Sequence, residues 1–313
     1  MTVTLALGAM NFGTTTDEAT SVALLDRFVE AGGTMIDTAN CYSFWNHPSG
    51  YGGQSEELLG RWFASRPGVR DRVVLSTKCG AEPTVADGDW PETREGLGAK
   101  AVTDALHASL KRMGVERVEY FWSHMEDRRV PAEETVAGLG ALVAEGLVGK
   151  LGASNHTTWR VEQARGIARG LGVEGYGAVQ LSHSYVKPRP ESAKASGHRF
   201  GWFTDETRDY VVTEGLETWA YSPLLTGAYI RADRPLPEAY DHPGTTRKLA
   251  ALAAVAGELG VSLNQVVLAW LTGAPEKAVP IVGVSSLAQL DEALAGAALE
   301  LSVEQREALD AAV

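Results

Sequence analysis

Short apolar segments of β-type composition alternate with longer amphipathic segments along almost the whole chain. The predicted strands cover residues 5–8, 34–38, 72–78, 118–124, 149–155, 177–181, 217–221 and 278–283. The predicted helices cover residues 17–31, 55–66, 99–113, 131–146, 159–169, 206–215, 245–259, 263–271 and, as the last one, 286–298. Repeated βα units favour parallel strands, so eight of them predict a single (β/α)8 TIM barrel domain over residues 1–313. A doubly wound open sheet is the alternative arrangement of these units.

The first predicted helix shows which local signals set helix ends. We expect Thr16 to be its N-cap, because a threonine hydroxyl can accept a hydrogen bond from a free backbone N–H of the first turn. Asp17 and Glu18 follow, where negative charge stabilises the positive end of a helix. The pair Gly32-Gly33 ends the pattern just before the next strand.

The composition is that of a folded protein with a large apolar core, since 44% of the residues are hydrophobic and 22% are charged. It excludes disordered, collagen-like and disulfide-stapled chains. The formal net charge of −12 argues against nucleic-acid binding, which needs a basic surface.

Cys41 and Cys79 are too few for a disulfide framework, which favours a reducing compartment. The first residues lack the basic segment of a signal peptide, and polar residues interrupt the apolar stretch 249–274. We therefore expect a cytoplasmic protein without a membrane span.

Polar side chains stand where the predicted strands give way to loops. They are Asp37, Lys78, His124 and the pair Ser154-Asn155. The carboxyl ends of all strands lie on one face of a parallel barrel, so these residues are expected to converge there. Tyr42, which follows Asp37 in the same loop, can fold back over that face.

Each of these residues also has an explanation without chemistry. Asp37 could cap a helix, Lys78 could be a solvated surface charge, and His124 could be a satisfied core histidine. Tyr42 could be an ordinary loop aromatic. Together, however, an acid, a base and a histidine at the ends of successive strands favour a reactive site. A buried lysine is costly unless it is paired, and Asp37 on the preceding strand is the candidate partner of Lys78.

Such a group suits the reduction of a carbonyl. A tyrosine hydroxyl has a pKa of about 10, and we expect the Lys78 ammonium to lower the pKa of Tyr42. Asp37 would keep Lys78 charged and oriented, and His124 could donate a hydrogen bond to a carbonyl oxygen beside the Tyr42 hydroxyl. A proton donor and an orienting donor around a C=O group suit hydride transfer from a bound nicotinamide.

Several motifs resemble those of the aldo-keto reductase superfamily, in the same order and spacing. They are GAMNFG at 8–13, DTANCY at 37–42, QSEELLG at 54–60, STK at 76–78, GASN at 152–155 and AYSPL at 220–224. The resemblance covers essentially the whole chain. It implies a catalytic tetrad of Asp37, Tyr42, Lys78 and His124, with Tyr42 as the general acid.

The same resemblance implies a nicotinamide cofactor site. The implied contacts are Ser154, Asn155 and Gln180 at the carboxamide, Tyr221 on the nicotinamide ring, Ser222, Leu224 and Gly227 beside the pyrophosphate, and Gly283, Ser285, Gln289 and Glu292 around the adenosine 2′-phosphate. The chain departs from the family pattern after His124, where Met125-Glu126-Asp127 replaces an apolar residue followed by Pro-Asp. It also carries an aromatic and glycine-rich insertion at 43–53, and Ala293 stands where the family often has Asn.

The adenosine end of this site bears on the choice of cofactor. Ser286 and Gln289 have capping-box spacing, so the backbone N–H groups at this helix start would face an anion. No Lys or Arg occurs between Lys277 and Arg306, so a bidentate cation for a 2′-phosphate is missing locally. The cations that could reach across from the preceding loop are Arg231, Arg234 and Arg247. We therefore predict NADPH, with only a modest preference over NADH.

Aromatic residues stand on several of the loops that follow the strands. They are Trp45, Trp90, Tyr185 and Trp202. We expect them to form an apolar wall for a substrate, with packing of the loops alone as an equal alternative. No paired cysteines, clustered histidines or HExxH motif indicates a metal site.

These inferences favour an NADPH-dependent reductase whose partner is a small carbonyl substrate, an aldehyde or a ketone. The alternative is a nicotinamide-binding regulatory subunit of the same superfamily with vestigial turnover. A metal-dependent barrel hydrolase or isomerase using Asp37 and His124 is a third hypothesis, which lacks a convincing ligand set. Sugar ketones, aromatic aldehydes and quinone-like compounds all stay open as substrates, and the sequence predicts no oligomeric state.

Overall fold

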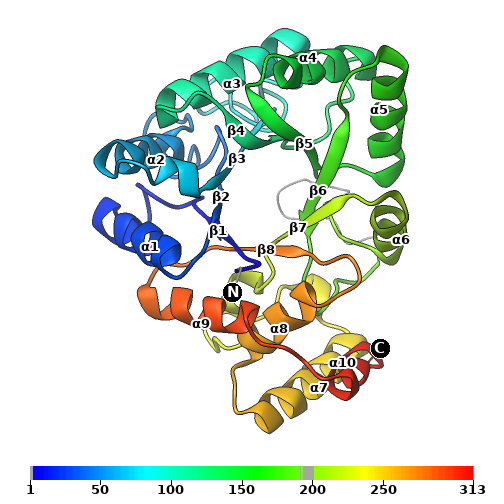
Figure 1. Ribbon diagram of the computed structural model, residues 1–313. Helices are drawn as coiled ribbons and strands as arrows, with labels where there is room; N and C mark the ends of the chain where they lie inside the picture. Colours follow the sequence, from blue (N-terminus) through cyan, green and yellow to red (C-terminus); the bar gives the residue numbers. More distant parts are fainter. Residues whose placement is uncertain (1–2, 191, 193–200, 313) are drawn as a thin grey trace.

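Eight parallel strands close into a barrel at the centre of the molecule (Figure 1). The computed structural model describes residues 3–190, 192 and 201–312. In both chain order and spatial order, the strands are β1 (Ala6–Gly8), β2 (Met35–Asp37), β3 (Val74–Cys79), β4 (Val118–Ser123), β5 (Val148–Ser154), β6 (Tyr176–Ser182), β7 (Glu217–Tyr221) and β8 (Val279–Val282). β1 also pairs with β8, so the sheet closes on itself. The predicted (β/α)8 barrel is confirmed, and the open doubly wound sheet is excluded.

Helices surround the barrel (Figure 1). They are α1 (Glu18–Glu30), α2 (Gln54–Ser65), α3 (Ala99–Met113), α4 (Ala132–Ala144), α5 (Thr158–Leu171), α6 (Asp205–Glu214), α7 (Pro243–Leu259), α8 (Leu263–Thr272), α9 (Leu287–Ala297) and α10 (Val303–Asp310). Local signals set many of their ends. α3 stops where Gly114 adopts a left-handed conformation with φ of 64°, which lets its N–H bond back to the carbonyls of Leu110 and Lys111.

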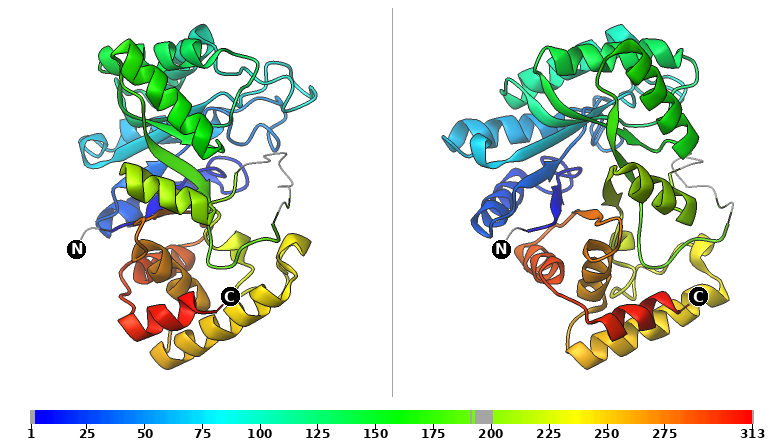
Figure 2. Two further views of the ribbon diagram at one scale, coloured as in Figure 1. Left: turned by 90° about the vertical axis from the view of Figure 1, so that its right-hand side faces the viewer. Right: turned by 45° about the vertical axis from the view of Figure 1, so that its right-hand side comes forward.

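One helix end and one additional helix differ from the sequence expectation. Asp17, and not Thr16, is the N-cap of α1, because its carboxylate accepts the backbone N–H of Thr20 at 2.8 Å. The segment 286–298 is not the last helix, since α10 follows it and begins with a capping box between Ser302 and Gln305. α10 packs beside α7, as both views in Figure 2 show.

Aromatic side chains fill the interior of the barrel. Trp122 from β4 and Trp219 from β7 are both buried and meet edge to face, with ring centroids 5.5 Å apart. Gly152 on the adjacent strand β5 leaves the room that Trp122 needs, because a Cβ at this position would lie 2.0 Å from the indole ring. The barrel is therefore a packed core, and any ligand must bind at one of its ends.

A second apolar cluster lies beside the barrel, where α7, α8 and α10 pack together. It corrects one prediction, because Tyr185 belongs to this cluster and not to a substrate wall. Its side chain is fully buried, and its hydroxyl donates to the backbone carbonyl of Leu309 at 2.8 Å.

Within the described residues, no single helix is long and apolar enough to cross a membrane, and α7 and α8 reach that length only as a pair bent by 100°.

The strand register brings polar residues to the carboxyl end of the barrel. Asp37 on β2 pairs with Ser76 on β3, and Ser154 on β5 pairs with Gln180 on β6. The loops that follow β2 and β3 project from this end, on the side opposite the N-terminus (Figure 2, left). The residues that precede these loops therefore share one face, where active sites of such barrels are built.

Candidate active site

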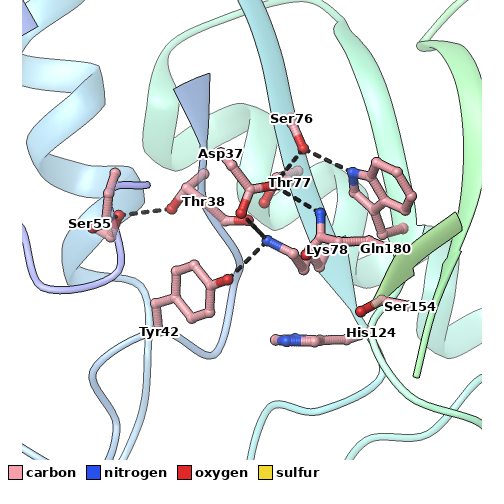
Figure 3. A network of polar contacts seen from close by, with 12 residues as sticks. Asp37, Thr38, Tyr42, Ser55, Ser76, Thr77, Lys78, His124, Ser154 and Gln180 are labelled. Atoms are coloured by element: carbon pink, nitrogen blue, oxygen red, sulfur yellow. Dashed lines mark hydrogen bonds and ion pairs between the residues drawn. The ribbon is translucent and has the colours of Figure 1, made fainter. Parts of the chain in front are cut away.

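Lys78 and Asp37 form an ion pair that is sealed from solvent. The Lys78 ammonium lies 2.5 Å from Oδ2 of Asp37, and both side chains are almost completely buried. The same ammonium donates to the backbone carbonyl of Thr38 at 2.7 Å and to the Tyr42 hydroxyl at 2.8 Å (Figure 3). All three donors of the lysine thus have partners, which offsets the cost of burying its charge.

The second oxygen of Asp37 is also fixed by hydrogen bonds. Oδ1 accepts from the Ser76 hydroxyl at 2.8 Å and from the side-chain amide of Gln180 at 3.2 Å (Figure 3). Ser76 in turn accepts the indole N–H of Trp122 at 2.7 Å. The carboxylate is therefore held by groups from β3 and β6, and its orientation toward Lys78 is set by the barrel itself.

Tyr42 lies in the loop after β2, which is anchored at both sides. The Thr38 hydroxyl contacts the Ser55 hydroxyl at 2.7 Å, which ties the end of β2 to the start of α2. Ser43 has a left-handed φ of 73°, and its hydroxyl donates to the backbone carbonyl of Met10 at 2.8 Å. These contacts point the Tyr42 hydroxyl at Lys78.

The protonation of Tyr42 differs from the sequence expectation. Burial raises the pKa of Tyr42 well above its ordinary value, and the Asp37 carboxylate raises it further. The Asp37 carboxylate offsets the effect of the Lys78 charge, so the pKa of Tyr42 is raised overall and not lowered as predicted. Burial also lowers the pKa of Lys78, against the opposing effect of Asp37. Tyr42 is therefore a protonated hydroxyl at neutral pH, ready to donate.

His124 follows β4 directly and lies beside Tyr42. The ring centroids of the two residues are 5.7 Å apart and their planes meet at 79°. The backbone N–H of His124 donates to the carbonyl of Cys79 at 2.8 Å, and its own carbonyl accepts from the Asn155 amide at 2.9 Å. Figure 3 shows the His124 ring, the Tyr42 hydroxyl and Lys78 grouped at one place, as the strand-end pattern predicts.

The strand ends next to His124 carry a connected set of polar groups. Asn155 has a left-handed φ of 58°, and its amide N–H also reaches the Ser154 hydroxyl at 3.0 Å. Its side-chain oxygen accepts from the Tyr221 hydroxyl at 2.7 Å. Asn155 thereby links β5 to β7 and leaves the half-buried ring of Tyr221 at the rim of the site.

The segment after β7 has an unusual backbone. Ser222, Leu225 and Thr226 have positive φ angles of 53°, 48° and 57°, and Gly227 follows with 94°. The amide of Gly227 closes the turn on the carbonyl of Leu224 at 2.8 Å. Strain of this kind in residues other than glycine clusters at sites that clamp a ligand.

The turn after β8 presents the N-terminus of α9 to solvent. A Cβ built on Gly283 would meet no atom within 4 Å, so this turn opens onto free space. Ser286 is the N-cap, and Gln289 accepts from the backbone N–H of exposed Ser285 at 2.8 Å. Glu292 is engaged elsewhere, because its carboxylate accepts from Ser262 at 2.5 Å.

Arg231 and Arg234, two candidate cations for a 2′-phosphate, contact groups of the loop that carries them. Arg231 forms an ion pair with Asp233 at 2.5 Å, and Arg234 donates to the backbone carbonyl of Thr226 at 3.2 Å. Both lie in the loop between β7 and α7, and the third, Arg247, lies on α7 itself.

Three of the four predicted substrate-contact aromatics remain at partly exposed positions. Trp45 is 48% exposed and meets Phe44 edge to face at 5.0 Å between ring centroids, while Trp90 packs on the same Phe44 at 5.6 Å. Trp202 is half-buried, 6.0 Å from the ring of Tyr240. Phe44, which was not predicted, is therefore the link between Trp45 and Trp90.

Sequence reasoning also missed acidic residues beneath the loop of Tyr42. Oε1 of Glu95 accepts from the side chain of Asn40 at 2.8 Å and from the backbone N–H of Gly80 at 2.5 Å. Oε1 of Glu82 accepts the backbone N–H of Gly52 at 2.9 Å, and burial raises the pKa of Glu82 to about 7. These carboxylates anchor the loops after β2 and β3 to each other. No sequence spacing signals this role, because the partners are far apart along the chain.

The third hypothesis, a metal-dependent barrel enzyme, requires a set of metal ligands, and the described part of the chain contains none. No three His, Cys, Asp or Glu side chains there are placed to hold a metal ion together. The carboxylate oxygens of Asp37 instead accept hydrogen bonds from Lys78, Ser76 and Gln180.

Comparison of the sequence with known proteins identifies a matching family. The family model for the aldo/keto reductase family matches residues 4–313. The chain is 30% identical to the uncharacterized oxidoreductase YrpG of Bacillus subtilis, an alignment covering 96% of this chain and 88% of the relative. It is 30% identical to the norsolorinic acid reductase stcV of Emericella nidulans, covering 96% and 76%. It is 32% identical to the human aflatoxin B1 aldehyde reductase member 4, covering 93% and 87%.

Proposed function

The chain belongs to the aldo/keto reductase family, and we propose that it reduces the carbonyl group of an aldehyde or ketone with NADPH as the hydride donor. The observation that carries this proposal is the bond from the Lys78 ammonium to the Tyr42 hydroxyl, with His124 at the side of the same tyrosine. A neutral proton donor with a cation behind it is what a carbonyl oxygen needs as it gains negative charge.

In the proposed reaction, Tyr42 donates a proton and Lys78 stabilises the phenolate that remains. A bound nicotinamide supplies the hydride that adds to the carbonyl carbon. Tyr42 gives its hydroxyl proton to the carbonyl oxygen, and the resulting phenolate is stabilised by the Lys78 ammonium 2.8 Å away. Asp37 keeps that ammonium in place through the transfer, and His124 donates a hydrogen bond to the same oxygen.

The polar groups around the barrel end suit a nicotinamide dinucleotide. Ser154, Asn155 and Gln180 supply amide and hydroxyl groups for the carboxamide, and the half-buried ring of Tyr221 supplies a stacking face. The strained turn that contains Ser222, Leu224 and Gly227 would hold the pyrophosphate side. The free space at Gly283 and the helix start at Ser285 and Gln289 suit the adenosine end.

The preference between the two nicotinamide cofactors follows from charge. Backbone N–H groups at the start of α9 attract a 2′-phosphate. Arg231 forms an ion pair with Asp233, which offsets part of the attraction that it could offer to a 2′-phosphate. Glu292, whose carboxylate is held by Ser262, also brings negative charge near this end. We therefore propose NADPH with a modest preference over NADH.

For the substrate, we propose a planar or aromatic carbonyl compound. Trp45 presents an exposed ring in the loop that carries Tyr42, and it packs against Phe44, which in turn contacts Trp90. The names of two relatives, a norsolorinic acid reductase and an aflatoxin B1 aldehyde reductase, agree with an aromatic substrate class.

Because both cysteines are free thiols, we also propose that the protein works in the reducing cytoplasm.

A screen of cofactor oxidation with a panel of carbonyl compounds tests this function. The expected result is turnover of aromatic aldehydes or ketones, with kcat/KM higher for NADPH than for NADH by less than about a thousandfold. A strong preference for NADH would overturn the cofactor assignment. Tight NADPH binding without turnover across the panel would instead support the rival function, a regulatory subunit.

A further inference from the structure

Cys41 contacts the catalytic histidine candidate directly. Its Sγ lies 3.3 Å from Nδ1 of His124, and its side chain is 2% exposed. The contact joins the loop after β2, which carries Tyr42, to the end of β4. It therefore connects the proton donor of the proposed reaction with the ring that orients the substrate.

We infer that Cys41 is a positioning residue: its thiol donates an S–H···N hydrogen bond to Nδ1 of His124 and so fixes the imidazole in the tautomer that carries its proton on Nε2. The Nε2–H group is then the donor that would bind the carbonyl oxygen beside Tyr42. The hydrogen bond itself is independent of the proposed function, and only this last consequence depends on it.

The direction of the hydrogen bond follows from the surroundings of the thiol. Burial raises the pKa of Cys41 well above its ordinary value, and the carboxylates of Glu82 and Glu95 raise it further, against an opposing effect of Lys78. The sulfur therefore keeps its proton at neutral pH. A thiol sulfur is also a weak acceptor, whereas an imidazole nitrogen without a proton is a good one.

The tautomer matters because a neutral imidazole has only one N–H. Which nitrogen carries it is set by the hydrogen bond that the other nitrogen makes. If Nδ1 accepts from Cys41, the proton must be on Nε2. Without this donor Nδ1 is no longer held as an acceptor, and we expect the fraction of molecules with the proton on Nε2 to fall.

Three substitutions separate this role from simple packing. Cys41→Ala removes the donor from the apolar cluster that Cys41 shares with Ala39, Ala81 and Met125. Cys41→Ser keeps a donor at the same position. Cys79→Ala is the matched control, because Cys79 is equally buried but belongs to the main core between barrel and helices.

Nitrogen-15 NMR of histidine-labelled protein without ligands reads the tautomer directly, with the His124 signals assigned by their loss in His124→Asn. At a pH where the ring is neutral, the wild type is expected to show Nδ1 unprotonated and Nε2 protonated. Cys41→Ser should keep this pattern and Cys41→Ala should show a mixture. A wild-type ring protonated on Nδ1, or an unchanged tautomer in Cys41→Ala, would overturn the inference.

Kinetics then test the consequence. We expect kcat to fall about tenfold in Cys41→Ala, the order of one typical hydrogen bond, and by less than about threefold in Cys41→Ser, with the loss mainly in kcat and not in KM. Cys79→Ala should keep the wild-type kcat. Equal kcat in Cys41→Ala and wild type would refute the positioning role. A wild type that holds the Nε2–H tautomer but reduces no carbonyl would refute the proposed function alone.

Discussion

The Lys78 ammonium lies 2.5 Å from the Asp37 carboxylate, in a place that solvent does not reach. This pair has a structural and an electrostatic consequence. Burial and the Asp37 carboxylate raise the pKa of Tyr42 despite the nearby cation, so the tyrosine keeps its proton until a carbonyl oxygen takes it. Once the proton has left, the same cation faces a phenolate and stabilises it.

The ion pair predicts a particular pattern of stability. Lys78→Met leaves the Asp37 carboxylate buried without its cation, which should cost about 3–5 kcal/mol of unfolding free energy. The double variant Lys78→Met/Asp37→Asn removes both charges and should be more stable than Lys78→Met alone. Urea unfolding of the wild type, Lys78→Met and the double variant measures these free energies. The exposed pair Arg27–Asp291 provides the control, since Arg27→Met should cost less than about 1 kcal/mol.

The same variants, together with Asp37→Asn alone, test whether the two residues act as one unit in catalysis. Each single substitution should lower kcat/KM by at least about a hundredfold, and the double variant should be no worse than Lys78→Met, because residues that share one function are strongly non-additive. If the logarithms of the two effects simply add, Asp37 and Lys78 do not serve the same step.

The exposed indole of Trp45 predicts substrate selectivity. Trp45→Ala should lower kcat/KM about tenfold for a bicyclic aromatic aldehyde, the order expected for one lost ring contact, and less than about twofold for a short aliphatic aldehyde. Trp159→Ala is a matched control, because Trp159 is 58% exposed but lies under Arg128 and Arg160. Equal losses for both aldehydes in Trp45→Ala would remove Trp45 from the substrate site.

Glu82 predicts how stability changes with pH. Its pKa is raised from 4.5 to about 7 in the folded protein, chiefly by burial. Between these values the unfolded chain loses the proton while the folded one keeps it, so stability falls as the pH rises and stays lower above pH 7. Glu82→Gln keeps an acceptor for the N–H of Gly52 and removes the charge. It should therefore stabilise the protein by about 1–3 kcal/mol more at pH 8.5 than at pH 5.

Urea unfolding at the two pH values measures this difference. Glu116→Gln, at an exposed residue between α3 and β4, controls for the loss of one negative charge. A stabilisation by Glu82→Gln that is the same at pH 5 and pH 8.5 would show that Glu82 does not titrate in this range.

The fold could be predicted from local patterns, because each βα unit carries its own periodicity and helix signals. The predicted ranges 99–113 and 217–221 coincide with α3 and β7. α10 was missed because its apolar face is small, with Leu309 as its one buried residue. The capping-box spacing of Ser302 and Gln305 was the signal that could have found it.

The site could be predicted only where strand ends define it. Asp37, Lys78 and His124 share a face because the barrel topology puts them there. Tyr185 was misplaced because nothing local decides which way a loop residue turns, and here the cluster of α7, α8 and α10 buries it. The contact between Cys41 and His124 depends on how two loops meet in space, which a single sequence does not encode locally.

The most direct test of the proposed reaction is the rate of carbonyl reduction by Tyr42→Phe. This substitution keeps the aromatic ring and removes the proton that the reaction consumes. We expect kcat to fall about 10²–10⁴-fold or more, as for other positioned general acids, while the dissociation constant for NADPH changes less than about twofold. A Tyr42→Phe protein that reduces the substrate at nearly the wild-type rate would contradict the account, because some other group would then donate the proton.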